Sequence, residues 1–200
     1  MNKFCWMLTL FCAIFHVGIS AAGTPPAAAV SNAEHQAAIT KVLIEHRSAV
    51  MTLNLKKMLT VCSKDYRETA WNGKIQTYDD FLKIAKAFDA IRNSDDLETV
   101  VENAMIIQNE VISDRQREHA ASLKKTAKAR EIIDTVRKNL DTMITAGSAS
   151  ARYIRIRDIR IDGEKASAVC ELQMPDGSAG YRRDCSLILH RGQWLVQQVR

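Results

Sequence analysis

Residues 153–199 read YIRIRDIRIDGEKASAVCELQMPDGSAGYRRDCSLILHRGQWLVQQV. Apolar and polar residues alternate through most of this stretch, and alternation at every second position is typical of a strand with one buried face. Turn signals divide the stretch at Asp162-Gly163, Pro175-Asp176-Gly177-Ser178 and Arg191-Gly192. The sequence therefore predicts four antiparallel strands that are joined by short turns.

The first of these strands has a break in its pattern near Asp158. Ile154 and Ile156 alternate with arginines before the break, and Ile159 and Ile161 do so after it in the opposite phase. Because a slip of one residue exchanges the two faces of a strand, we expect a β-bulge near Asp158. Bulges bend strands, so the pattern favours a strongly curved sheet.

The front half of the chain has the periodicity of helices. Apolar residues between positions 32 and 62 recur at helical spacing and predict one long amphipathic helix, with His46 on its buried stripe. Thr77 is the expected N-cap of a further helix, because a short side-chain oxygen can accept a free backbone N–H. Residues 94–147 keep helical spacing on both sides of a polar break at Ser113, so we expect a helical hairpin there.

The N-terminus has the features of a secretory signal peptide. A positive start at Lys3 precedes an apolar run over residues 4–19, and small residues follow, so we expect cleavage after Ala21 or Ala22. An uncleaved membrane anchor is the alternative. We expect a secreted or periplasmic protein with no membrane span after processing.

The remaining length fits one domain of ordinary size. The predicted organisation is a signal peptide at 1–22, a linker at 23–33, and a single domain at 34–200 that contains the helical insertion 94–147. The 200-residue chain has a formal net charge of +5, which is too small to indicate a nucleic-acid partner. No group of residues has metal-ligand or cofactor-binding spacing, so we expect neither a metal nor a cofactor.

Three of the five cysteines lie beyond the signal peptide, and two of them fall on neighbouring predicted strands. A hairpin centred on Gly177-Ser178 places Cys170 and Cys185 directly opposite each other, where a small adjustment would allow a disulfide. A hairpin centred on Asp176-Gly177 places Cys170 opposite Arg183 instead. The sequence leaves open a disulfide or two buried free thiols.

Five segments carry a resemblance to a known superfamily. They are residues 62–66 (CSKDY), 71–73 (WNG), 77–81 (TYDDF), 159–166 (IRIDGEKA) and 192–196 (GQWLV). Their order resembles the nuclear transport factor 2-like superfamily, which includes ketosteroid isomerase, scytalone dehydratase and polyketide-cyclase-like proteins. The resemblance implies an α+β fold, a cystatin-like roll in which long N-terminal helices pack in a strongly curved antiparallel sheet. Such a cone has a pocket at its wide end, and the helical insertion departs from the compact members.

Three residues are candidates for a ligand site in this cone. His46 would face the hollow as a base or hydrogen-bond donor, although a histidine in that position can also be a satisfied core residue. Tyr66, next to Asp65, supplies a phenol of the type that holds an oxyanion, or is a half-buried packing residue. Trp71 would line the mouth of the cone. We assign no catalytic residue.

The favoured interpretation is a secreted or periplasmic non-catalytic binding protein with a cone-shaped pocket for a small apolar ligand or a protein partner. One alternative is a cofactor-independent isomerase, dehydratase or cyclase that uses His46. Another is a structural module that forms a homodimer through its sheet or its insertion. The contents of the hollow distinguish these: converging ionisable groups favour an enzyme, an empty apolar cavity a ligand binder, and a filled hollow an interaction module.

Overall fold

The helices and strands alternate in blocks along the chain. In order, they are α1 (Asn32–Met51), α2 (Leu55–Thr60), β1 (Cys62–Thr69), β2 (Ile75–Thr77), α3 (Tyr78–Asn93), α4 (Leu97–Ile107), α5 (Asp114–Ser122), α6 (Ala127–Ala151), β3 (Ile154–Asp162), β4 (Lys165–Gln173), β5 (Ala179–His190) and β6 (Gln193–Val199). The computed structural model describes residues 32–70, 72–108, 110–124, 126–174 and 179–200. The predicted signal peptide and Trp71 lie outside the described residues.

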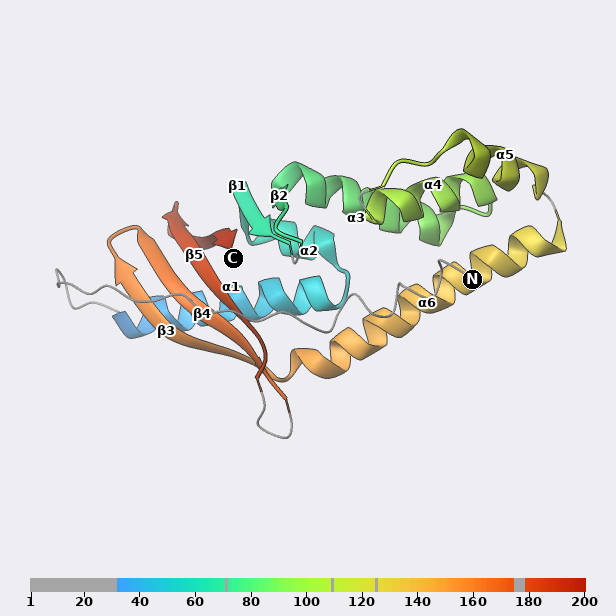
Figure 1. Cartoon of the computed structure of the whole chain (residues 1–200). Helices are drawn as coiled ribbons and strands as arrows, with labels where there is room; N and C mark the ends of the chain where they lie inside the picture. The colour runs from blue at the N-terminus through green and yellow to red at the C-terminus, as the bar shows by residue number, and fades with distance from the viewer. Residues whose placement is uncertain (1–31, 71, 109, 125, 175–178) are drawn as a thin grey trace.

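The strands form one mixed sheet in the order β2-β1-β6-β5-β4-β3 (Figure 1). The four strands predicted from residues 153–199 are β3 to β6, and they pair with one another in antiparallel fashion. The expectation of a purely antiparallel sheet is wrong, because β1 joins the sheet parallel to β6. The expected α+β class, with helices preceding the main part of the sheet, is confirmed.

The predicted bulge is present but does not produce the predicted curvature. The register of β3 against β4 shifts between Arg157 and Arg160, and Asp158 takes a positive φ of 53°. The sheet as a whole is not strongly curled, so the cone shape is not reproduced in the form expected. The bulge bends the strand that carries it, and β3 is an edge strand.

The long first helix predicted over residues 32–62 is two helices. It ends at Met51, and Leu53 takes a left-handed φ of 54°. Asn54 then caps α2, since its side chain accepts a hydrogen bond from the N–H of Lys57. The apolar periodicity runs through this break and so conceals it.

The described residues of the insertion form three helices, where the sequence predicted a hairpin of two. Each begins at a capping side chain: Asp96 for α4, Ser113 for α5 and Thr126 for α6. Arg137 of α6 fastens the insertion to the end of α3, because it donates to the carbonyl oxygens of Ile91 at 3.1 Å and Ser94 at 2.7 Å. These bonds satisfy carbonyls at a helix end that would otherwise lack partners.

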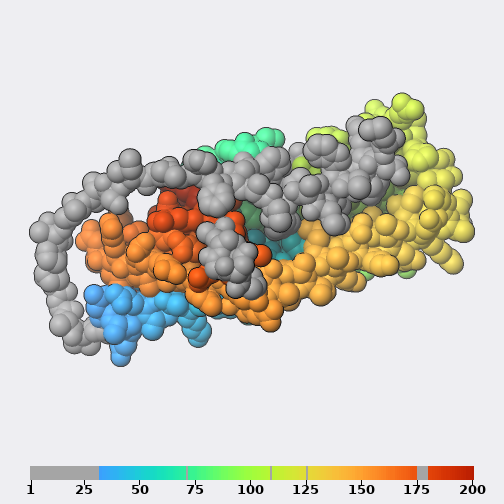
Figure 2. Space-filling model, turned by 60° about the horizontal axis from the view of Figure 1, so that its bottom comes forward, coloured from blue at the N-terminus to red at the C-terminus, as the bar shows by residue number. Residues whose placement is uncertain are grey.

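Helices α1, α2 and α3 pack on one face of the sheet, which we call the inner face, and α4, α5 and most of α6 extend beyond it (Figure 1). Helix α1 contacts β3 and β6, and α3 contacts β1. One hydrophobic cluster connects Leu43 of α1 and Val196 of β6 with Phe88 of α3, Val100 of α4 and Leu140 of α6. Figure 2 shows the elongated body that results, with the sheet and α1 at one end and α5 and the start of α6 at the other. The insertion therefore shares the core of the domain.

Candidate functional site

Two helical residues and two strand residues meet under the inner face of the sheet. Helix α1 supplies His46 and Arg47, and β1 supplies Tyr66 and Glu68, which share a face because they are two positions apart. His46 and Tyr66 are 0% exposed, Arg47 is 6% exposed and Glu68 is 7% exposed. Buried polar groups of this kind are stable only when they are hydrogen-bonded and paired.

These four side chains form a connected network. Tyr66 donates its hydroxyl to Glu68 Oε2 at 2.6 Å, and Arg47 Nη1 donates to Glu68 Oε1 at 3.0 Å. His46 Nε2 lies 2.9 Å from the Tyr66 hydroxyl oxygen. Because the single hydroxyl proton of Tyr66 goes to Glu68, His46 Nε2 must carry a proton and donate it to Tyr66. His46 Nδ1 is then an acceptor, and it has no partner among the described residues.

Burial sets the protonation states of the network. Desolvation, and then the positive charge of Arg47, lower the pKa of His46 to about 3, so the imidazole is neutral near pH 7. Burial alone would raise the pKa of Glu68, but Arg47 and the hydrogen bonds from Tyr66 and Arg47 outweigh it and hold that pKa below its ordinary value. Burial, followed by the charge of Glu68, raises the pKa of the Tyr66 phenol. The network therefore holds one ion pair and two neutral groups.

The space between α1 and β1 is filled at His46 and Tyr66. His46 and Tyr66 have no solvent-accessible surface, so no cavity large enough for a water molecule borders either side chain. The ionisable groups that converge here are thus shielded from a diffusing substrate. Their arrangement can orient one another and fix α1 against β1, but it offers no reacting position to a bound molecule.

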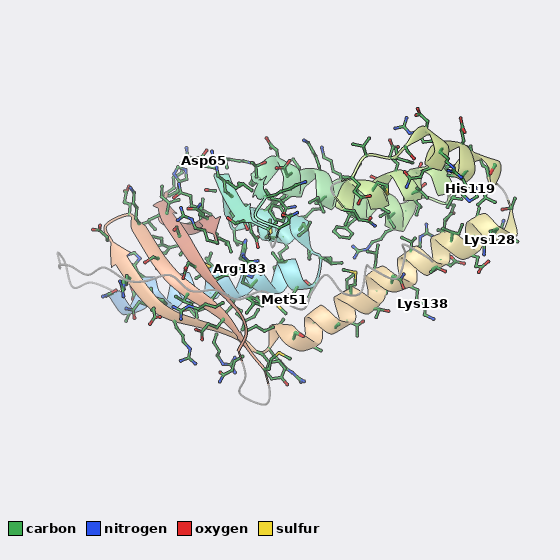
Figure 3. All side chains as sticks on the ribbon, viewed as in Figure 1. Met51, Asp65, His119, Lys128, Lys138 and Arg183 are labelled. Atoms are coloured by element: carbon green, nitrogen blue, oxygen red, sulfur yellow. The ribbon has the colours of Figure 1, made fainter. Side chains whose placement is uncertain are left out.

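The network approaches the surface at one end. Arg47 Nε donates to the Tyr181 hydroxyl at 3.3 Å, and the Arg47 guanidinium carbon lies 5.2 Å from the centre of the Tyr181 ring. Nearby on β5, Arg183 Nη1 donates to the carbonyl oxygen of Thr69 at 3.2 Å. Tyr181, Arg183 and Thr69 are half-buried, and Figure 3 shows Arg183 on the helix-facing side of the sheet. We call Arg47, Thr69, Tyr181 and Arg183 the mouth.

The structure brings together two of the three predicted ligand-binding residues. His46 and Tyr66 are hydrogen-bonded neighbours, so His46 has the partner that the sequence did not identify. Trp71 lies outside the described residues. Asp65 is exposed, and it points away from the face that Tyr66 occupies. That His46, Tyr66 or Trp71 binds a ligand stays a prediction.

Sequence reasoning missed Arg47, Glu68 and Tyr181. Glu68 could have been found from strand parity, because it shares a face with Tyr66. Arg47 could not, because a charged residue next to His46 carries no local signal of burial, and its partner Glu68 is 21 positions away. Tyr181 lies on β5, and strand alternation carries no signal of its contact with Arg47 of α1, 134 positions away.

The two strand cysteines do not form the disulfide considered above. The hairpin has the alternative register, in which Cys170 pairs with Arg183 and Cys185 pairs with Ala168. The cysteines are therefore diagonal neighbours, and both are buried free thiols. Burial raises the pKa of Cys170 to about 11 and that of Cys185 to about 12, which leaves them protonated and unreactive.

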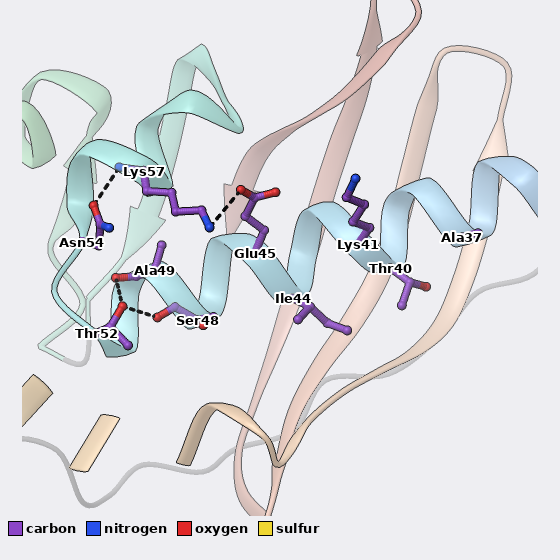
Figure 4. A pocket seen from close by; sticks show the side chains of 10 residues that line it. All are labelled: Ala37, Thr40, Lys41, Ile44, Glu45, Ser48, Ala49, Thr52, Asn54 and Lys57. Carbon is purple, nitrogen blue, oxygen red and sulfur yellow. Dashed lines mark hydrogen bonds and ion pairs between the residues drawn. The ribbon is translucent and has the colours of Figure 1, made fainter. Parts of the chain in front are cut away.

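An open groove of about 890 Å³ runs along the outward side of α1, away from His46 (Figure 4). Its floor contains the exposed side chain of Ile44, and an ion pair between Glu45 and Lys57 at 3.4 Å closes one side. The lining residues are Ala37, Thr40, Lys41, Ile44, Glu45, Ser48, Ala49, Thr52, Asn54 and Lys57. The groove contacts none of the network's buried polar atoms.

Within the described residues, no group of three or more His, Cys, Asp or Glu side chains has the arrangement of a metal site. None of the described helices combines the length and apolar character needed to cross a bilayer.

No protein-family model matches the chain, and no curated protein sequence matches it. Solved structures match at low similarity. A ketosteroid isomerase candidate from Shewanella frigidimarina is 10% identical, with a TM-score of 0.34, over 80% of this chain and 89% of that one. A Mycobacterium tuberculosis protein of unknown function is 13% identical, with a TM-score of 0.36, over 84% and 74% of the two chains.

A candidate calcium/calmodulin-dependent protein kinase II association domain from Xanthomonas campestris is 12% identical, with a TM-score of 0.34. The match covers 94% of this chain and 95% of that chain. Identities and TM-scores at this level say nothing about activity. What supports the nuclear transport factor 2-like layout is the chain's own order of elements, with helices packed on one face of a sheet that ends in a meander.

Proposed function

We propose that this chain is an exported, non-catalytic binding protein that takes a small ligand at the mouth. The observation that carries the proposal is the difference in burial between the network and the neighbouring residues of β5. The groups suited to proton transfer, His46 and Tyr66, are completely buried, whereas Tyr181 and Arg183 are half-buried at the edge of the inner face.

The network supports binding better than catalysis. A general base has to reach the proton that it abstracts, within about 3 Å. His46 instead uses Nε2 on Tyr66, and its pKa of about 3 keeps it from exchanging a proton near neutral pH. The ion pair between Arg47 and Glu68 fixes the position of Arg47, and so supports the Tyr181 ring against which it packs. Because Tyr181 is already held in place, little conformational entropy is lost when a ligand binds it, and this favours recognition.

The same geometry limits the ligand. Because His46 and Tyr66 fill the space between α1 and β1, a ligand can contact the mouth but cannot pass beyond it toward these two residues. We therefore place the ligand above Tyr181 and Arg183. This is a shallower site than the cone-shaped pocket that the superfamily resemblance implies.

Chemical-shift mapping tests this assignment. The processed chain, from residue 23, is labelled with nitrogen-15 and titrated with three six-carbon probes: 1-hexanol, hexylamine and hexanoate. We expect at least one probe to shift the amide signals of Thr69, Tyr181 and Arg183. Shifts confined to the α1 groove, at Ile44 and Ser48, or no shifts with any probe, would overturn the proposal.

A further inference from the structure

Neighbouring arginines on β5 face opposite sides of the sheet. Arg182 pairs across the ladder with Glu171, and its guanidinium lies 3.8 Å from Glu171 Oε1 and 3.9 Å from Asp158 Oδ2. Arg183 pairs with Cys170, which is completely buried, so its side chain starts on the inner face. Arg182 therefore has carboxylates as neighbours, whereas the hydrogen bond of Arg183 goes to a backbone carbonyl.

The positive charge at the mouth is only partly balanced. The charge of Arg47 is matched by Glu68 at 3.0 Å. Arg183 has an ion pair with none of the residues that the structure describes, and its bond there goes to the uncharged carbonyl of Thr69. A half-buried charge without a counter-charge is poorly solvated, so an arriving anion gains more there than at an exposed arginine.

The mouth also offers donors that can reach a ligand. A guanidinium has five N–H donors in a planar fork, and Arg183 uses Nη1 on Thr69. The Tyr181 hydroxyl accepts from Arg47, which leaves its own proton free to donate. The acceptor in the network, Glu68, already receives Tyr66 on one oxygen and Arg47 on the other. A ligand that presents acceptors fits these donors, and the positive charge of Arg183 repels a ligand that presents an ammonium group.

We infer that the mouth is a carboxylate-binding site, in which Arg183 and the Tyr181 hydroxyl hold the carboxylate of a small monoanionic ligand beside the Arg47–Glu68 pair. The inference rests on the proposed function and adds the chemical class of the ligand. A carboxylate matches the fork of a guanidinium in a bidentate manner. Its single charge also matches the single unbalanced positive charge among Arg47, Glu68 and Arg183.

The test compares the affinities of the probes for the processed chain and two variants at pH 7. We expect hexanoate to bind about tenfold more tightly than hexanol or hexylamine, as one good charge-assisted contact would give. Arg183→Gln should remove this advantage. Arg182→Gln, the adjacent change on the outer face, should retain it. Arg183→Lys, which keeps the charge without the fork, should give an intermediate affinity, and it replaces Arg183→Gln if that variant does not fold.

The outcomes separate the two proposals. Equal binding of all three probes at the mouth would overturn the carboxylate assignment and leave the proposed function in place. A hexanoate advantage that survives in Arg183→Gln, or inorganic phosphate that binds the mouth more tightly than hexanoate, would also overturn it. Absence of binding at Thr69, Tyr181 and Arg183 by every probe would overturn both.

Discussion

Gly147 of α6 lies directly against the backbone of Met51, the last residue of α1, so that a Cβ on Gly147 would overlap the Met51 carbonyl oxygen. The absence of a side chain lets the end of the helical insertion cross the end of the first helix. The sequence shows a glycine near the end of a helical pattern, where a helix stop is the ordinary interpretation. In the structure α6 continues past it to Ala151.

Gly147→Ala should therefore destabilise the protein. In an open helix this change adds roughly 1 kcal/mol of stability, because alanine favours helix. Here the added methyl meets backbone, and we expect a loss of about 1–3 kcal/mol, as for other overpacked sites. Urea unfolding gives the free energy, with the exposed neighbour Ser148→Ala as the control. A stabilised Gly147→Ala protein would show that the two helices separate easily.

The buried ion pair predicts strong coupling between Arg47 and Glu68. Arg47→Met and Glu68→Leu each leave a buried charge without its partner, and we expect each to cost about 3–5 kcal/mol. The double variant should lose much less than the sum, because it removes both charges together. The exposed pair Lys128 and Glu131, at 3.0 Å, is the control and should show coupling below about 0.5 kcal/mol. Additive losses at Arg47 and Glu68 would mean that the two residues do not pair in solution.

Stability should fall as the pH falls below the ordinary pKa of histidine. The pKa of His46 is about 3 in the folded chain and near 6.5 in a free histidine. Between these values the unfolded chain binds a proton that the folded chain does not. The contribution is fully present above pH 6.5 and is lost toward pH 3, by up to about 1.4 kcal/mol per pH unit.

His46→Gln should flatten this dependence between pH 6.5 and 5, a window above the carboxylate range of Glu68. Urea unfolding at several pH values measures the slope. His119→Gln, at an exposed position of α5, should leave the slope as in the parent chain. If the unfolding free energy of both variants depended on pH in the same way, His46 would titrate as a solvent-exposed histidine and the burial argument would fail.

Trp194 should be among the most costly residues to truncate. It is 3% exposed, and its indole N–H donates to His35 Nδ1 of α1 at 3.1 Å, so the last strand packs on the first helix. Trp194→Ala should cost about 3–5 kcal/mol, a large part of a typical domain's total. Leu195→Ala, on the other face of β6, should cost clearly less. Similar small losses for both would contradict the packing of β6 on α1.

The sequence alone determined the class of the fold and the positions of four of its strands, β3 to β6. Alternation over residues 153–199 located β3 to β6 and the bulge at Asp158, because strand periodicity and turn residues are local signals. Helical spacing located the helices but missed the breaks at Leu53 and after Ser122, since these depend on single backbone angles and caps. The sequence also selected His46 and Tyr66 as inner residues.

The tertiary structure alone decided how these elements come together. The parallel pairing of β1 with β6 joins segments more than 100 residues apart, and no local pattern specifies it. Glu68 and Arg47 meet only because α1 packs across β1, and burial removes both side chains from water, so that each charge depends on the other as its partner. The hairpin register that separates Cys170 from Cys185 likewise does not follow from strand alternation, because both candidate registers keep the two cysteines on the same face. Chain periodicity sets which face a residue occupies, whereas packing between distant segments sets which residue it meets there.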